Sequence, residues 1–132
     1  MRLVVVTPER LVLDAEVEEI YAPGVMGQFG VLPEHVNFLT SLVPGEVRYR
    51  EKGADRYLAI GGGVCEVVDD VVTILADTAE TADEIDLERA VSAEQRAVAV
   101  LDSVAFGSAE YEEVRSAADR AAARRAVASR AA

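Results

Sequence analysis

Val71-Val72-Thr73-Ile74-Leu75-Ala76, followed by Asp77-Thr78-Ala79-Glu80-Thr81-Ala82-Asp83-Glu84, divides the chain into two parts of different character. The first six residues are a short apolar run rich in β-branched side chains, typical of a strand buried on both faces. Residues 77–84 form an acidic, polar connector, and no proline follows it. The sequence therefore predicts a β-sandwich or a flattened barrel over residues 1–84 and an antiparallel α-helical hairpin over residues 85–132.

Short apolar or alternating runs, separated by turn residues, predict the strands of the first part. They span residues 3–7, 11–14, 17–22, 29–31, 37–42, 46–50, 56–60, 64–68 and 71–75. Gly61-Gly62-Gly63 lies between two of these runs, but neither a Gly-Lys-Ser/Thr sequence nor a helix follows it. We therefore expect a bulge or a close backbone approach there and not a phosphate-binding loop.

Apolar residues recur at three- and four-residue spacing after the connector, which predicts a helix from about residue 86 to 105. Glu94 interrupts this apolar stripe. Gly107-Ser108 breaks the pattern, and Ser108 is a suitable N-cap for a second helix that runs to about residue 129. The residues expected to face the partner of the second helix are Ala117, Ala118, Ala121 and Ala122. Each alanine methyl buries little area, so we expect a hairpin that is only weakly fastened to the sandwich.

Charge and composition exclude several classes of function. The net charge of −11 argues against nucleic acid as a partner. No apolar run is long enough to cross a bilayer, so we expect a soluble chain without direct membrane insertion. With one histidine, one cysteine and one lysine (His35, Cys65 and Lys52), no metal site or catalytic constellation is supported, so we expect a protein that is not an enzyme.

The charges are also unevenly distributed. Residues 1–84 carry 6 basic and 16 acidic side chains, whereas residues 115–132 carry 5 basic side chains and 1 acidic one. An acidic front and a basic tail suggest two surfaces for different partners, although a solvated helix end would look the same.

Gly27-Gln28-Phe29-Gly30-Val31-Leu32-Pro33-Glu34-His35 has the composition of a shaped loop. It should expose Gln28, Glu34 and His35 and half-bury its apolar side chains. Two interpretations stand: a contact surface on a rigid scaffold, or a bent hairpin with a structural purpose.

Five segments together resemble the epsilon subunit of the F-type ATP synthase of bacteria, over essentially the full length of the chain. They are residues 27–35, Val43-Pro44-Gly45-Glu46-Val47-Arg48, Gly61-Gly62-Gly63-Val64-Cys65-Glu66-Val67, residues 71–77, and Ile85-Asp86-Leu87-Glu88-Arg89-Ala90. His35-Val36-Asn37 departs from the His-Ala-Pro of many relatives, so the following strand is expected to begin earlier.

The resemblance implies a ten-stranded β-sandwich followed by two helices. It also implies a non-catalytic rotor subunit of the central stalk, on the cytoplasmic face of the bacterial plasma membrane. The sandwich would link the gamma subunit to the c-ring, and the helices would extend toward the alpha and beta subunits and inhibit ATP hydrolysis. No cofactor is required.

The resemblance further assigns residues to contacts. The c-ring contact would consist of Gly27, Gln28, Phe29, Gly30, Leu32, Glu34 and His35. The basic contact to the beta subunit would consist of Arg115, Arg120, Arg124, Arg125 and Arg130.

ATP as a regulatory ligand of the folded hairpin is implied by the motif at residues 85–90. The residues that would bind it are Ile85, Asp86, Arg89, Ala90, Arg96, Arg120 and Arg124, because four guanidinium groups facing one seam suit a triphosphate. In the other interpretation, Asp86 caps the helix and the arginines are solvated. A free-standing ATP-sensing module is the alternative to a rotor subunit.

Overall fold

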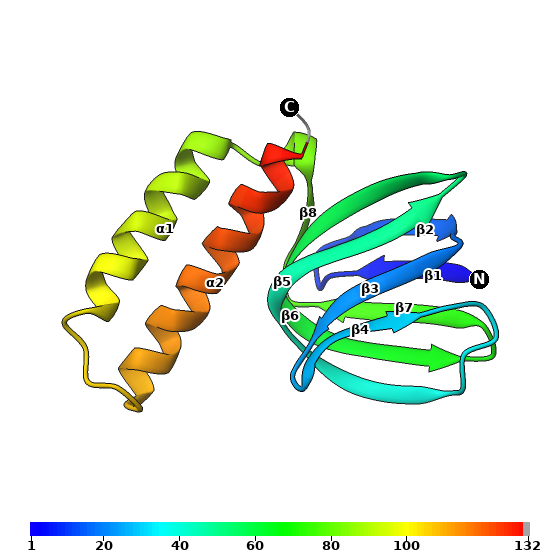
Figure 1. Ribbon diagram of the computed structural model, residues 1–132, viewed down its shortest axis with the longest axis horizontal. Coiled ribbons are helices and arrows are strands. Elements are labelled where there is room, and N and C mark those ends of the chain that lie inside the picture. The colour runs from blue at the N-terminus through cyan, green and yellow to red at the C-terminus, as the bar shows by residue number, and fades with distance from the viewer. Residues whose placement is uncertain (131–132) are drawn as a thin grey trace.

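The computed structural model describes residues 1–130, which form a β-sandwich followed by two antiparallel helices (Figure 1). The strands are β1 (Arg2–Val6), β2 (Leu11–Glu16), β3 (Glu19–Gly24), β4 (Gly27–Val31), β5 (Phe38–Glu51), β6 (Ala54–Val68), β7 (Val71–Ala76) and β8 (Ala79–Thr81). A 3₁₀ turn, η1 (Ala82–Glu84), leads to α1 (Leu87–Leu101) and α2 (Ala109–Ser129). The predicted fold class, a β-sandwich followed by a helical hairpin, is confirmed.

All eight strands belong to one hydrogen-bonded sheet that folds onto itself, in the order β2-β1-β7-β6-β5-β3-β4, with β8 paired to β6. The β1–β7 pair is parallel and the other pairs are antiparallel. β5 and β6 curve through the side of the sandwich that faces the helices, so each contributes to both layers (Figure 1). The apolar side chains between the layers form the main core, in which Leu3, Ile20, Leu58 and Ile74 are almost completely buried.

The sandwich has eight strands, where about ten were expected. Residues 38–51 form one strand through Pro44-Gly45, because Pro44 stays in register opposite Gly61 of β6. Residues 54–68 are likewise continuous through the triple glycine. β8 was not predicted, since it lies in the polar connector, where it pairs with Leu58–Ile60 of β6.

The triple glycine allows a close backbone approach, as expected. A Cβ at Gly63 would lie 2.9 Å from the backbone Cα of Ala76 in β7. A Cβ at Gly61 would meet the side chain of Thr78 and lie 3.2 Å from Cδ of Arg120, which belongs to α2. The curved part of β6 therefore forms the seat on which the second helix lies.

Both helices begin with the expected caps. The side chain of Asp86 accepts a hydrogen bond from the backbone N–H of Arg89, and the side chain of Ser108 accepts one from that of Tyr111. α1 ends at Leu101, earlier than the expected residue 105, and the hydroxyl of Ser103 donates to the carbonyl of Val100 over 2.8 Å in the turn that follows.

α2 lies between α1 and the sandwich (Figure 1). A second, small apolar cluster joins the three, and its members are Ala59, Ile85, Ala90, Ala123, Val127 and Ala128. Of the alanines expected at the packed face, Ala118 and Ala121 are buried, and Ala117 and Ala122 are half-buried. The division into independent units at residues 84 and 85 stays a prediction. Neither helix of the described part combines the length and the apolar character that a membrane crossing requires.

Candidate functional site

The segment from Gly27 to His35 is half strand and half loop. Residues 27–31 form the edge strand β4, paired to β3, and only the residues after Val31 turn away from the sheet. Gln28 and Glu34 are exposed as expected, and Phe29 is half-buried against Phe38, with ring centroids 5.5 Å apart. Val31 is buried, whereas Leu32, expected to be half-buried, is 57% exposed.

Two contacts hold the loop in shape. Glu34 has a positive φ of 67°, and its N–H donates to the Asp70 side chain in the β6–β7 turn over 2.8 Å. His35, expected to be exposed, is half-buried, and its ring lies 5.0 Å from that of Phe38. Because the β6–β7 turn holds the backbone at Glu34 and Phe38 holds the ring of His35, the loop is a preformed surface.

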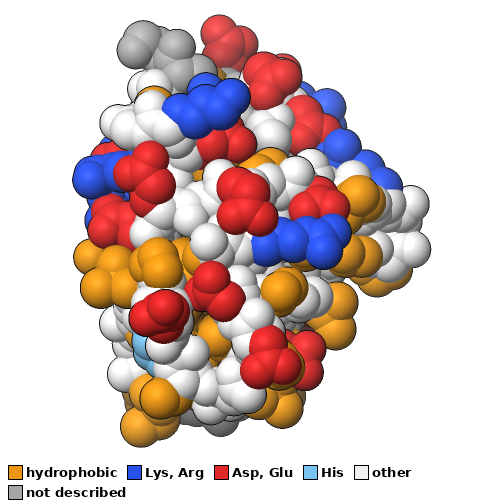
Figure 2. All heavy atoms as spheres, turned by 90° about the vertical axis from the view of Figure 1, so that its right-hand side faces the viewer, with side chains coloured by type: hydrophobic (Ala, Val, Ile, Leu, Met, Phe, Trp, Pro, Cys, Tyr) orange, Lys and Arg blue, Asp and Glu red, His pale blue; other side chains and the backbone are white. Residues whose placement is uncertain are grey.

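This surface has more apolar area than the sequence indicated. Besides Leu32, the large side chains of Met26 and Val36 are 96% and 75% exposed. Figure 2 views the end of the sandwich away from the helices, and its lower part shows hydrophobic and acidic side chains but no Lys or Arg. Met26 and Val36 were not predicted, because the resemblance that assigns this surface covers residues 27–35 and both residues lie just outside that segment.

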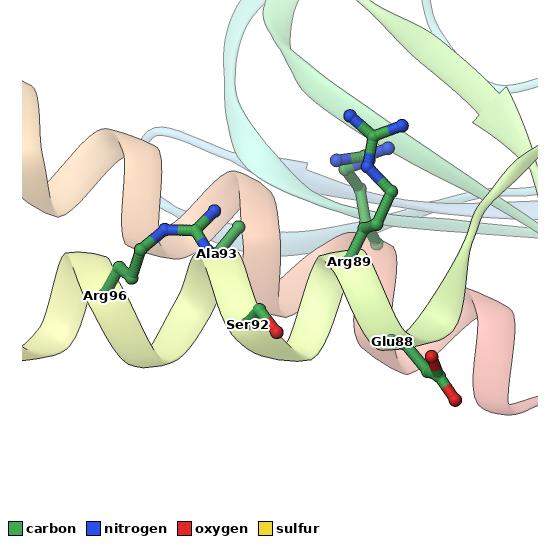
Figure 3. Close-up of a pocket in the computed structure, with 6 residues that line it drawn as sticks. Glu88, Arg89, Ser92, Ala93 and Arg96 are labelled. Carbon is green, nitrogen blue, oxygen red and sulfur yellow. The ribbon is translucent and has the colours of Figure 1, made fainter.

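Three of the arginines expected to bind a nucleotide line one cavity. Arg89 and Arg96 of α1 and Arg124 of α2 surround a volume of about 450 Å³, together with Glu88, Ser92 and Ala93. Figure 3 shows the side chains of Arg89 and Arg96 on the same side of α1, while Glu88 points the other way. Among residues 1–130, neither Arg89 nor Arg96 forms an ion pair, so both guanidinium groups are available to an anion.

The other four residues of the expected nucleotide site lie outside this cavity. Ile85 and Ala90 are buried in the small apolar cluster, and Asp86 caps α1. Arg120 donates to the hydroxyl of Ser116 over 3.0 Å and lines a neighbouring groove with Arg96 and Val100. The structure thus brings together three of the four expected arginines.

The arginines of α2 that were expected to contact the beta subunit are mostly paired within the chain. Arg125 forms two hydrogen bonds with Glu94 of α1, of 2.7 and 3.1 Å. Arg130 forms two with Glu46 of β5, both of 2.8 Å, and these bonds raise the pKa of its guanidinium.

The contact between Arg124 and Glu80 of β8 has poorer geometry than the pairs of Arg125 and Arg130. Its Nε is 2.8 Å from Oε1 without hydrogen-bond geometry, and its Nη2 donates to Oε2 over 3.3 Å. Arg115 is exposed and lines a shallow cleft beside Gly24 and Val43.

The acidic partners of these arginines are site residues that the sequence did not reveal. Glu46 and Glu80 come from strands that lie far from α2 along the chain, so only the tertiary structure brings them to the helix. Glu94 could have been found, since a carboxylate inside an apolar helical stripe needs a cationic partner.

An apolar row crosses the outer face of the sheet in the layer formed by β2, β1, β7 and the second half of β6. Leu11 pairs with Val6, Val6 with Leu75, and Leu75 with Val64, so the four side chains lie side by side on β2, β1, β7 and β6. Leu11 and Leu75 are 58% and 56% exposed. Val6 and Val64 between them are half-buried, so the row is a partly exposed apolar strip, the kind of surface that a partner can cover.

These features define a class of protein in which a β-sandwich carries a docked helical hairpin and presents contact surfaces. Within residues 1–130, the side chains of His, Cys, Asp and Glu do not gather into a group that could hold a metal ion.

Comparisons with known proteins agree on one family. Residues 1–82 match the family described as ATP synthase, Delta/Epsilon chain, beta-sandwich domain. The ATP synthase epsilon chain of Geobacter sulfurreducens is 46% identical over 132 residues, which are all of this chain and 96% of the relative. The ATP synthase epsilon chain 2 of Syntrophotalea carbinolica is 49% identical over 131 residues, 98% of this chain and 94% of the relative.

A chain in the cryo-EM structure of the Euglena gracilis mitochondrial ATP synthase, OSCP/F1/c-ring in rotational state 1, superposes with a TM-score of 0.79. The two are 27% identical, and the match covers 94% of this chain and 78% of that one. The chain therefore belongs to the delta/epsilon chain family of ATP synthase, and it is a non-catalytic central-stalk subunit by family.

Proposed function

We propose that this chain is the rotor subunit that links the gamma subunit to the c-ring of a bacterial F-type ATP synthase and regulates ATP hydrolysis through its helices. It would lie on the cytoplasmic face of the plasma membrane. The observation that supports the proposal is that one sandwich carries three separate features: the preformed loop after β4, the partly exposed apolar row, and the seat of α2.

The gamma subunit would bind the apolar row of Leu11, Val6, Leu75 and Val64. Burying such a row stabilises an assembly by about 25 cal/mol per Å² of apolar area. Leu75→Glu should therefore weaken binding to purified gamma, whereas Leu87→Glu, on the exposed side of α1, should not. Equal binding by both variants would refute this assignment.

The loop side of the sandwich would meet the polar loops of the c-ring. Glu34 argues against a lipid contact, since an anionic headgroup would repel it. Cysteines at Gln28 or Glu34 should crosslink to cysteines in the c-subunit loop in membranes, and a cysteine at Lys52, in the β5–β6 turn, should not. Crosslinks from Lys52 alone would show that the β5–β6 turn, and not the loop after β4, faces the ring.

ATP would bind in the cavity of Arg89, Arg96 and Arg124 and stabilise the docked hairpin. A ligand shifts such an equilibrium only through its differential affinity for the two states, and the cavity needs residues from both helices. High ATP should thus favour the docked, non-inhibiting state.

Calorimetric titration of the isolated chain with ATP tests this regulation. Arg89→Ala and Arg124→Ala should each abolish or strongly weaken binding, whereas Arg115→Ala, outside the cavity, should bind as the unmodified chain does. If none of the three substitutions alters ATP binding, the proposed site is refuted.

A free-standing ATP sensor is the second candidate, favoured by the same cavity. Co-purification separates the two functions, because a rotor subunit is recovered from membranes with alpha, beta and gamma chains. A sensor is recovered alone.

A further inference from the structure

The apolar contact between α2 and the sandwich is small. Of the six buried members of the cluster at this contact, four are alanines and two, Ile85 and Val127, have larger side chains, while the half-buried Tyr57 packs against them. Alanine methyl groups bury little area, so they leave the docked position of α2 weakly determined by the hydrophobic effect.

Two ion pairs tie α2 to the sandwich at its C-terminal half. Arg130 binds Glu46 of β5 with two hydrogen bonds, and Arg124 contacts Glu80 of β8. The third ion pair of α2, Arg125 with Glu94, joins it to α1 and stays inside the hairpin.

The Arg130 pair has the geometry that makes a surface ion pair effective. Its guanidinium group is bidentate to Glu46 and lies over the ring of Tyr57, 4.1 Å from the centroid. Glu46 pairs with Ala59 in the β5–β6 ladder, and Tyr57 is two residues from Ala59, so all three side chains lie on one face of the sheet. A bidentate, stacked arginine loses less entropy on binding than a lysine would.

We propose that Glu46 and Glu80 form a charge latch that holds α2 on the sandwich, with Arg130 as its principal cation. The latch uses the same arginines that an acidic partner outside the chain would bind. Such a partner must displace Glu46 and Glu80, so the two carboxylates set how readily the basic face of α2 becomes available. The regulatory meaning of the latch rests on the proposed function, but its effect on docking is a property of the isolated chain.

The latch is tested by measuring the distance between two spin labels on the full, isolated chain without ATP. The labels are attached to cysteines introduced at Lys52 on the sandwich and Asp119 on α2, both of which are exposed. Cys65 is completely buried and is not labelled in the folded chain. The distance distribution then separates docked from undocked hairpins.

Glu46→Gln and Glu80→Gln should each raise the ratio of undocked to docked chains by about two- to fivefold, the range for single surface ion pairs. Raising the ionic strength to about 1 M, where the Debye length is about 3 Å, should do the same to the unmodified chain. Glu94→Gln is the matched control. It also removes a carboxylate that pairs with an arginine of α2, but this pair lies inside the hairpin, so the docked distance should not change.

Charge reversal makes the result decisive. Arg130→Glu places two carboxylates opposite each other and should undock the hairpin, and adding Glu46→Arg should restore the docked distance. Docking that persists in Arg130→Glu, that the double variant fails to restore, or that Glu94→Gln disrupts equally would overturn the latch. None of these outcomes depends on ATP or on other subunits.

Discussion

Gly63 is the position at which one added methyl group should damage the sandwich most. Its φ of +144° is one that side chains with a Cβ rarely adopt, and a Cβ there would overlap the carbonyl oxygen of Leu75 and lie 2.9 Å from Cα of Ala76. These are backbone atoms of β7 that pair with β6 at this residue, so they cannot move without breaking the ladder.

The two costs of Gly63→Ala can be added. The unfavourable φ costs about 1–3 kcal/mol, and the loss of one or two ladder hydrogen bonds costs about 1–2 kcal/mol more. The total of about 3 kcal/mol is a large share of the 5–15 kcal/mol by which domains are typically stable.

Gly53→Ala provides the matched control. Gly53 also has a positive φ, of +79°, but nothing lies within 4 Å of the position of its Cβ, so only the cost of about 1 kcal/mol remains. In urea unfolding followed by far-UV circular dichroism, with a slope of about 2 kcal/mol/M, the midpoints should fall by about 1.5 M and 0.5 M, respectively. Equal shifts for the two variants would refute the steric argument.

Four further predictions concern the helices and the titratable groups. Val127→Ala should weaken the docking of α2 by about 1.5 kcal/mol, the value of two methylene equivalents. Relative to the unmodified chain, hydrogen exchange should become faster in α2 but not in the core strands. Asp86→Ala should fray the first turn of α1 and cost about 1 kcal/mol, measurable by NMR chemical shifts, whereas Asp86→Asn keeps the cap. The hydrogen bond from Arg50 lowers the pKa of Asp55, so its contribution to stability is present at neutral pH and is lost as the pH falls through that lowered pKa; Asp55→Asn should make the acid loss of stability shallower. Burial raises the pKa of the Cys65 thiol to about 11, so alkylation at about pH 8 should occur only as fast as the chain unfolds, and rapid labelling of the folded chain would contradict this.

The sequence was sufficient to predict most of the elements, because strand and helix periodicities are local properties. It failed where tertiary pairing decides the outcome. Pro44-Gly45 has the composition of a turn, yet it continues β5 because β6 supplies a ladder partner in Gly61. Ala79-Glu80-Thr81 has no strand pattern and becomes β8 only because Leu58–Ile60 has an open edge.

The candidate sites followed the same rule. Helical spacing was enough to place Arg89 and Arg96 on one side of α1, and the cavity includes both. The position of Arg120 could not be derived, because it depends on how far α2 is rotated about its own axis and on the hydroxyl of Ser116. The carboxylates that neutralise α2 likewise belong to strands whose location only the folded sheet determines.

The curvature of β5 and β6 has a mechanical consequence. The two strands contain 14 and 15 residues, and their ladder extends from Phe38 opposite Val67 to Glu51 opposite Ala54. One end of this two-stranded ladder adjoins the loop after β4, and α2 lies against its bend. A torque applied at the loop would therefore pass to the seat along this ladder, in which Val43 and Gly62 at the bend are the two residues without a register partner. In a rotating assembly, the two paired arms of the ladder would act as stiff levers, and the compliance of the coupling would lie at the bend between them.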